Sequence, residues 1–180
     1  PRCRYLAGIE LDPEAAREGS AFFDDPVLDD VVRGLAGPWR EAFDVVVAAD
    51  ILEHLPEPGQ ALDLLRPLLR EEGLLLVSLP NVANVTVRLA LLLGRFPRTQ
   101  RGILDRTHLG FFTRRTGREL LEAHGYRVVR ETPTAMPVEL AFPVLGRPPL
   151  SAPVRAAATL LARAWPGMFG YQFVYEARPA

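Results

Sequence analysis

The chain has 180 residues, of which 48% are hydrophobic and 24% are charged, so it can bury one hydrophobic core as a single domain over residues 1–180. Its formal net charge is −1, which offers no general field for holding nucleic acid or an anionic membrane. All 21 basic residues are arginine, and the absence of lysine excludes Schiff-base chemistry and a P-loop nucleotide site. We therefore expect no nucleic-acid partner and a binding site that depends on local shape.

Cysteine content and hydropathy restrict the location of the protein. The single cysteine, Cys3, can form neither an internal disulfide nor a cysteine-based zinc site, which favours a reducing, cytoplasmic environment. No uninterrupted apolar stretch approaches the roughly 20 residues that cross a bilayer, and no signal-peptide pattern opens the chain. We expect no integral membrane segment.

The first third of the chain predicts one strand, one helix and a mixed region. Residues 5–11 form an apolar run closed by acidic residues, which indicates a strand, and residues 12–14 look like a helix N-cap followed by a first-turn proline. Phe22-Phe23 indicates a weak strand. Residues 24–26 look like a helix start, with a short helix over 27–35.

The middle of the chain carries the clearest strand–helix–strand pattern. Residues 43–49 predict a buried strand, residues 59–69 carry leucines at helical spacing, and residues 74–79 predict the next strand. Strands and helices that alternate in this way form a parallel sheet with right-handed crossovers. The fold class expected is therefore α/β.

The second half of the chain predicts further elements with a longer polar connection. The expected elements are a helix over 82–96, a polar segment over 97–113, a helix over 114–124 stopped by Gly125, a strand over 126–131, a proline-punctuated stretch over 133–153, a helix over 154–165 and a last strand over 171–177. No internal repeat is visible. The chain thus continues the same fold beyond its central strands.

The most informative stretch is residues 43–56, FDVVVAADILEHLP. Its continuous apolar run reads as a parallel strand whose carboxyl end opens into a binding crevice. Asp50, Glu53 and His54 follow that strand closely, and a helical turn would bring them near one face. This segment is the first candidate for a functional site.

Several pieces in a fixed order resemble the class I S-adenosylmethionine-dependent methyltransferases, especially the subgroup of quinone-biosynthesis O-methyltransferases. The pieces are GIELDPEAA at 8–16, FDVVVAADILEHLPEP at 43–58, EEGLLLVSLPNVAN at 71–84, ILDRTHLGFFT at 103–113 and LLEAHGYRVV at 120–129. The resemblance implies a Rossmann-like three-layer α/β/α fold, mostly parallel with an antiparallel last strand. It also implies methyl transfer from S-adenosylmethionine to an oxygen or nitrogen of a small-molecule acceptor. Residues 82–113 and 133–165 would then be acceptor-side or lid insertions.

The resemblance also implies cofactor contacts. Glu10 matches the acidic residue that accepts hydrogen bonds from the ribose hydroxyls, because a carboxylate offers two oxygens to a diol, and Leu11 would lie against the adenine. The alternative for Glu10 is an acid that stabilises the following helix N-terminus. Asp24 and Asp25 occupy the region of an acid near the adenine amino group, and an N-cap role is the alternative.

The resemblance places the reacting groups after the strand at 43–49. Ala49 and Asp50 match the loop that faces the methionine part of the cofactor and the acceptor. His54 is a candidate general base that takes a proton from the acceptor, and the alternative is a histidine that orders the loop through backbone hydrogen bonds.

The other two histidines have weaker claims to a catalytic role. His108 is the second candidate base, and its alternative is a turn residue held by Asp105 or Thr107. His124 precedes Gly125 at a helix end and is expected only to place a favourable charge there. Neither an HxH nor an HExxH spacing exists, so no metal site is expected.

Two apolar stretches, residues 85–96 and 140–144, are compatible with a membrane-facing patch or a wall for a lipid acceptor. Core packing is the commoner explanation for such stretches. Nothing in the sequence argues against a homodimer.

The chain departs from the family pattern at its first strand. The glycine-rich turn of the form GxGxG should precede Tyr5, and no G-x-G triplet occurs in the sequence. The family order puts that strand between those at 5–11 and 43–49. Three explanations follow: a fragment of a longer methyltransferase, a degenerate relative whose flanking strands pair directly and bind no cofactor, or a strand supplied by a partner chain.

Two other functions compete with methyl transfer. A non-catalytic domain would keep the fold as a binding or scaffold module. A nicotinamide dehydrogenase would share the acid-ended strand but gives no role to the LEHLP and SLPN pieces.

Overall fold

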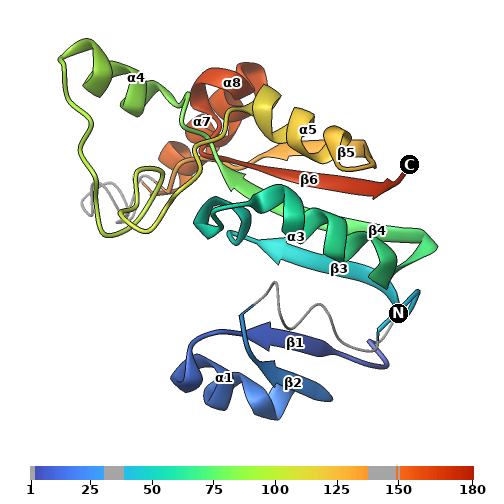
Figure 1. The fold of residues 1–180 in the computed structure, drawn as a ribbon. Helices are drawn as coiled ribbons and strands as arrows, with labels where there is room; N and C mark the ends of the chain where they lie inside the picture. The colour runs from blue at the N-terminus through green and yellow to red at the C-terminus, as the bar shows by residue number, and fades with distance from the viewer. Residues whose placement is uncertain (1–2, 31–38, 138–148, 150) are drawn as a thin grey trace.

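The computed structural model describes residues 3–30, 39–137, 149 and 151–180. Its main sheet has the strand order β3-β4-β6-β5. The strands are β3 Phe43–Ala49, β4 Leu69–Pro80, β5 Tyr126–Pro133 and β6 Gln172–Pro179. β3 and β4 are parallel, whereas β6 runs antiparallel to both β4 and β5 (Figure 1). The predicted α/β fold with an antiparallel last strand is confirmed.

A second, two-stranded sheet lies beside β3. It pairs β1 Ala7–Glu10 with β2 Asp25–Leu28 in parallel, and α1 Pro13–Gly19 with the short turn η1 Ser20–Phe22 connects the two strands. Figure 1 shows this layer below the main sheet, next to the β3 edge. In the described part of the chain, β1 and β3 belong to separate sheets. Direct pairing of these two strands, one of the three explanations above, is therefore wrong.

Aromatic contacts join the two sheets at their amino ends. The ring of Tyr5, just before β1, stacks on Phe43 at the start of β3 with a centroid distance of 6.2 Å. Trp39 meets the same Phe43 ring edge-on at 5.8 Å. Because the amino ends of β1 and β3 meet there, the carboxyl ends of both strands lie toward the same edge.

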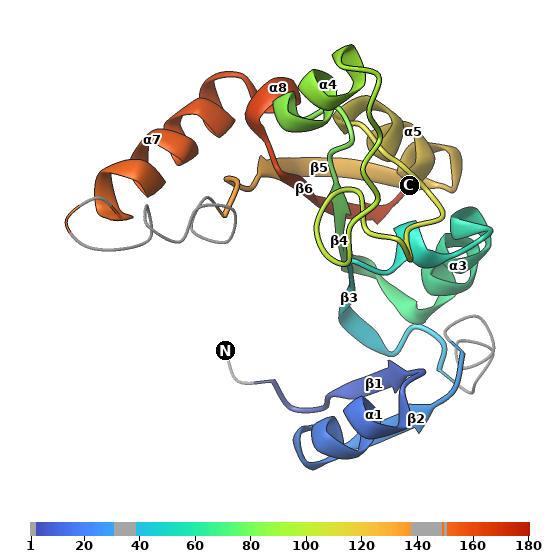
Figure 2. The same cartoon turned by 90° about the vertical axis from the view of Figure 1, so that its left-hand side faces the viewer.

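Helices cover one face of the main sheet and one of its ends. The elements are η2 Leu52–His54, α3 Pro58–Leu65, η3 Arg66–Leu68, α4 Val85–Leu92, α5 Arg114–Ala123, α7 Ser151–Ala164 and α8 Pro166–Phe169. Figure 2 shows α3 and α5 on the same side of the sheet, with α4 and α8 near each other at its far end. Leu62 of α3 and Leu121 of α5 pack with Leu75 and Tyr175 in a single buried cluster.

Local sequence signals account for several helix ends. The Asp12 carboxylate accepts hydrogen bonds from the N–H groups of Glu14 and Ala15, both at 2.8 Å, and thereby caps α1 as predicted. Gly125, with a φ of 77°, follows α5 and provides the left-handed turn that stops it.

The expected helix start at residues 24–26 is wrong, because Asp25–Leu28 is strand β2. The Asp24 side chain accepts a hydrogen bond from the Leu6 N–H at 2.8 Å, and the Asp24 N–H donates to the Leu6 carbonyl at 2.8 Å. These bonds fasten the segment to the chain before β1 instead of capping a helix. Phe22 lies in a 3₁₀ turn, so the weak strand at 22–23 is also wrong. Residues 31–35 of the predicted helix lie outside the described residues.

Other boundaries shift by a few residues. The helix predicted over 59–69 ends at Leu65, and β4 begins at Leu69. The helix predicted over 82–96 is α4, capped by the Asn84 side chain, which accepts from the Thr86 N–H at 3.1 Å. Within the described residues, no helix has both the length and the apolar character that crossing a membrane requires.

Candidate functional site

A groove of about 660 Å³ runs between the two sheets. Its walls include residues 6–11, 29–30, 45–48, 51–52 and 54–56. Val45 and Val47 are 48% and 63% exposed there, although they belong to an apolar strand. Their neighbours Val46 and Ala48 also line the groove, and they pack against the core cluster that includes Leu62 of α3. The uncovered face and edge of β3 therefore form an apolar wall that is open to a ligand or to another segment.

Acidic residues gather at the carboxyl ends of β1 and β2. Glu10 ends β1 and lines the groove, and its Oε1 accepts hydrogen bonds from the N–H groups of Leu11 (2.9 Å) and Asp12 (3.0 Å). Asp29 and Asp30 follow β2 and line the same groove, and the Asp29 N–H donates to the Glu10 carbonyl at 3.1 Å. Two acid-ended strands thus lie side by side at the groove, with the exposed Leu11 next to them.

Asp24 and Asp25 occupy the opposite end of β2. They are not among the residues that line the groove, and the Asp25 carboxylate accepts a hydrogen bond from the Tyr5 hydroxyl at 3.0 Å. Asp29 and Asp30 are the acids that sequence reasoning missed. The signal was present, because Val27 and Leu28 followed by two acids repeat the pattern of an apolar strand closed by Glu10.

The loop after β3 is held to the main sheet by Asp50. The Asp50 side-chain Oδ1 accepts hydrogen bonds from the Ser78 hydroxyl (2.7 Å) and from the Gln172 amide (2.8 Å). Asp50 has a φ of 54°, a left-handed conformation that aspartate tolerates better than most residues. Ala49, at the end of β3, pairs with Ser78 of β4. The backbone therefore turns sharply at the carboxyl end of the strand, as a binding loop requires.

The structure brings the two candidate catalytic histidines together. The rings of His54 and His108 meet edge to face with a centroid distance of 4.8 Å. His54 Nδ1 lies 3.3 Å from the Thr107 carbonyl, and His108 Nδ1 lies 3.1 Å from the Ile103 carbonyl. Because a carbonyl only accepts, both Nδ1 atoms carry hydrogen, and in the neutral form of each ring Nε2 keeps its lone pair.

The two histidines differ in exposure. His54 is exposed and lines the groove, whereas His108 is only 7% exposed, and burial lowers its pKa. The Asp105 carboxylate does not hold the His108 ring, since it accepts instead from the N–H (2.8 Å) and hydroxyl (2.6 Å) of Thr107. His124 lies elsewhere, where its Nδ1 contacts Asp63 Oδ1 at 2.8 Å beside the end of α5.

Glu53 lies between the loop and the core with its side chain fully buried. Neither of its carboxylate oxygens has a hydrogen-bond partner among the described residues, and burial raises the pKa of Glu53 to about 7. Its backbone carbonyl accepts from the N–H groups of Leu109 (2.7 Å) and Gly110 (2.9 Å). These bonds dock the segment that carries His108 onto the turn that carries His54.

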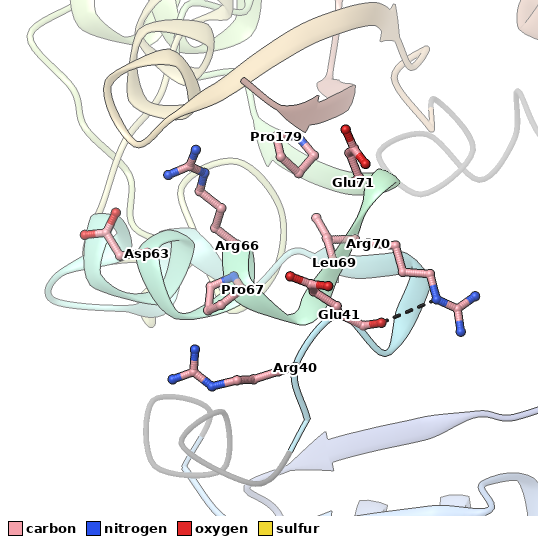
Figure 3. A pocket seen from close by; sticks show the side chains of 9 residues that line it. All are labelled: Arg40, Glu41, Asp63, Arg66, Pro67, Leu69, Arg70, Glu71 and Pro179. Atoms are coloured by element: carbon pink, nitrogen blue, oxygen red, sulfur yellow. Dashed lines mark hydrogen bonds between the residues drawn. The ribbon is translucent and has the colours of Figure 1, made fainter.

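A second hollow, of about 640 Å³, lies where β4 begins. Figure 3 shows its lining, which consists of Arg40, Glu41, Asp63, Arg66, Pro67, Leu69, Arg70, Glu71 and Pro179. The Arg70 side chain donates to the Glu41 carbonyl at 3.4 Å. This hollow is at the amino end of the parallel strands β3 and β4, opposite to the edge where α/β folds bind ligands. We therefore assign the functional site to the groove between the sheets.

Comparison with known families decides the class of protein. Residues 4–131 match the methyltransferase domain family, and that range includes the acid-ended strands, His54 and His108. The chain belongs to this methyltransferase family. A search of curated proteins finds no match.

Solved structures share the fold of this methyltransferase-family chain at low sequence identity. A SAM-dependent methyltransferase from Archaeoglobus fulgidus has a TM-score of 0.63 and 18% identity, over 96% of this chain and 75% of that one. A Burkholderia thailandensis 1,6-didemethyltoxoflavin-N1-methyltransferase, solved with S-adenosylhomocysteine, has a TM-score of 0.54 and 18% identity, over 98% and 61%. The [4+2]-cyclase SpnF has a TM-score of 0.55 and 21% identity, over 97% and 66%. The last example means that likeness of fold alone does not determine the reaction.

Proposed function

We propose that this methyltransferase-family chain takes part in methyl transfer from S-adenosylmethionine to an oxygen or nitrogen of a small-molecule acceptor. The single observation that carries the proposal is the convergence of Glu10, Asp29 and His54 on one groove. Those residues come from three chain segments, each at the carboxyl end of a strand. That edge is where open α/β sheets bind nucleotide-like ligands.

The cofactor would lie across the ends of β1 and β2. The Glu10 carboxylate is suited to accept the ribose hydroxyls, and the exposed Leu11 side chain is suited to pack on the adenine ring. We assign the adenine amino group to Asp29 or Asp30 in place of Asp24 and Asp25, because the first pair lines the groove and the second does not. Ala49 and Asp50 would face the methionine part.

We further propose that a strand with a glycine-rich turn fills the groove between β1 and β3 in the active protein. Both strands present an edge to this space, and both have their amino ends at the Tyr5–Phe43 contact, so an inserted parallel strand would have a hydrogen-bonding partner on each side. A segment continuous with the amino terminus or a partner chain would provide it.

Catalysis would consist mainly of positioning the acceptor atom in line with the methyl group and sulfur of the cofactor. The methyl carbon leaves the cofactor sulfur as it bonds to the acceptor atom, and the sulfonium becomes a neutral thioether. The lone pair on His54 Nε2 is available to take the proton of the acceptor, since Nδ1 is engaged with the Thr107 carbonyl.

Calorimetry with S-adenosylmethionine tests the proposal, with this chain and a form extended at its amino terminus measured side by side. The extended form should bind, and Glu10→Ala should weaken its binding by about tenfold, the loss expected for a hydrogen bond to a charged group. Glu14→Ala is the matched control, because Glu14 is an exposed acid of α1 outside the groove. If the extended form does not bind the cofactor, the proposal is wrong.

A non-catalytic binding or scaffold module is the second candidate. The open apolar groove favours this module if no strand fills the space, because the glycine-rich turn that contacts the cofactor would then be missing. In that case neither form would bind S-adenosylmethionine. Membership of the quinone-biosynthesis subgroup, a cytoplasmic location and a homodimer also stay predictions.

A further inference from the structure

The side chains of Glu53, His54 and His108 form a cluster. Methyl transfer that depends only on positioning the acceptor gives no role to Glu53 or His108. Within the described ranges, Glu53, His54 and His108 each offer a possible metal-ligand atom, and these atoms lie within 4.8 Å of one another. They come from two segments far apart in the sequence, the turn after β3 and the loop before α5. The docking of those segments through the Glu53 carbonyl holds the cluster together.

Glu53 is the least expected member of this cluster. A carboxylate that is fully buried normally has hydrogen bonds or an ion pair to offset its lost hydration. Both oxygens of Glu53 lack a hydrogen-bond partner in the part of the chain that the structure describes, and none of the ion pairs found there includes this residue. The nearby Asp50 carboxylate is occupied by Ser78 and Gln172 and adds only like charge.

The two histidines are oriented in the way that metal-binding histidines usually are. In such sites the ring nitrogen that does not bind the metal donates to a carbonyl or carboxylate, which fixes the tautomer and the ring plane. His54 and His108 both make this contact through Nδ1, with the carbonyls of Thr107 and Ile103. In its neutral form, each ring is left with an Nε2 lone pair for a cation.

We propose that Glu53, His54 and His108 bind a divalent transition-metal ion of the zinc type. Two imidazoles and one carboxylate are a ligand set that such ions prefer over Mg²⁺ or Ca²⁺, which favour oxygen ligands. With three protein ligands, a tetrahedral ion keeps one open position. The ion would be reached from the groove side, because His54 is the exposed ligand and lines the groove.

A bound ion would restrict which functional group of the acceptor is methylated. This conclusion rests on the proposed function. A hydroxyl bound at the open position loses its proton more easily, because the cation stabilises the resulting oxyanion. With the ion bound, His54 Nε2 is a ligand and no longer the base, so the proton passes to water. A C–O bond forms as the C–S bond of S-adenosylmethionine breaks, and the sulfonium becomes a thioether. The acceptor is therefore an alcohol or a phenol and not an amine.

Cobalt substitution tests the site without any methyl transfer. The protein is treated with a chelator, and Co²⁺ is added while the visible absorption is recorded. We expect one equivalent of Co²⁺ to give the intense d–d bands of a four- or five-coordinate site, and Zn²⁺ to abolish them. Glu53→Gln, His54→Ala and His108→Ala should each weaken binding by about 100-fold. His124→Ala, which removes the histidine outside the cluster, should bind as the parent does.

Two results would overturn the metal site: no stoichiometric cobalt band, or an equal loss of binding in His124→Ala. Glu53→Gln keeps the shape of the buried side chain, so circular dichroism of this variant separates loss of a ligand from loss of the fold. Calorimetry with S-adenosylmethionine is run on the same samples. Cofactor binding without a cobalt site removes only this inference, whereas a cobalt site without cofactor binding removes only the proposed function.

Discussion

The main sheet and the groove beside it differ in which side chains are buried. In the sheet, Leu75, Val77 and Tyr175 are almost completely buried in one apolar cluster with Leu62 of α3 and Leu121 of α5. At the groove, the apolar side chain of Val47 is exposed. In the turn beside it, the ionisable side chain of Glu53 is buried. This inversion costs stability, so its presence indicates a region that is completed by something that binds.

Truncation of a core side chain should have the largest effect. Leu75→Ala leaves a cavity in the packed sheet, and it should lower the free energy of unfolding by about 3 kcal/mol. Val47→Ala, on the groove side, should change it by less than about 0.5 kcal/mol. Urea denaturation measures both values. Equal losses would mean that the groove wall is as well packed as the core, which would remove the contrast between the two regions.

Loss of the groove histidine should act on rate more than on binding. His54→Ala removes the Nε2 lone pair that faces the acceptor, and turnover should fall by about 100-fold. The affinity for S-adenosylmethionine should change little. The measurement is the rate of S-adenosylhomocysteine formation with a panel of hydroxyl acceptors, together with calorimetry. A fall in affinity as large as the fall in rate would reassign His54 to binding.

Replacement of the buried acid should stabilise the protein in a pH-dependent way. The pKa of Glu53 is about 7 in the folded chain and 4.5 in its ordinary state, so the folded protein holds the proton more tightly. Stability is therefore lost as pH rises from 4.5 to 7 and stays low above that range. Glu53→Gln should avoid this loss, and with chelator present it should be more stable than the parent at pH 8 by on the order of 2 kcal/mol.

The same comparison at pH 4 is the internal control, because Glu53 is then mostly protonated in both states and the difference should nearly vanish. Thermal or urea unfolding at the two pH values gives the result. A difference that does not depend on pH would show that packing, and not charge, sets the effect of the substitution.

The smallest expected effect is on cofactor affinity, and it distinguishes the acids after β2 from those at its start. Asp29→Ala, at the groove, should weaken S-adenosylmethionine binding by about 5-fold, roughly 1 kcal/mol, as loss of one hydrogen bond does. Asp25→Ala, at the other end of β2, should leave it unchanged. Calorimetry on the N-terminally extended form compares them. A larger effect of Asp25→Ala would return the adenine contact to the position that the sequence predicted.

Local patterns in the sequence determined the elements whose interactions are mainly local. The strand at 43–49, the capped helix α1 and the helix that stops before Gly125 all follow from period, capping residue or glycine. The acid-ended strands were also readable, and Glu10 lines the groove as expected. Asp29 and Asp30 carried the same signal, which the proline and acids just before them concealed.

Only the tertiary structure determined the features that depend on residues far apart in the sequence. Asp24 could have capped a helix, but its hydrogen bonds to Leu6, far back in the chain, make the segment a strand. No spacing rule predicts that His108 meets His54 or that Glu53 is buried beside them, because a loop docking through the Glu53 carbonyl creates that contact. The family was visible in the order of local motifs, whereas the chemistry available to it depends on groups that meet only after folding.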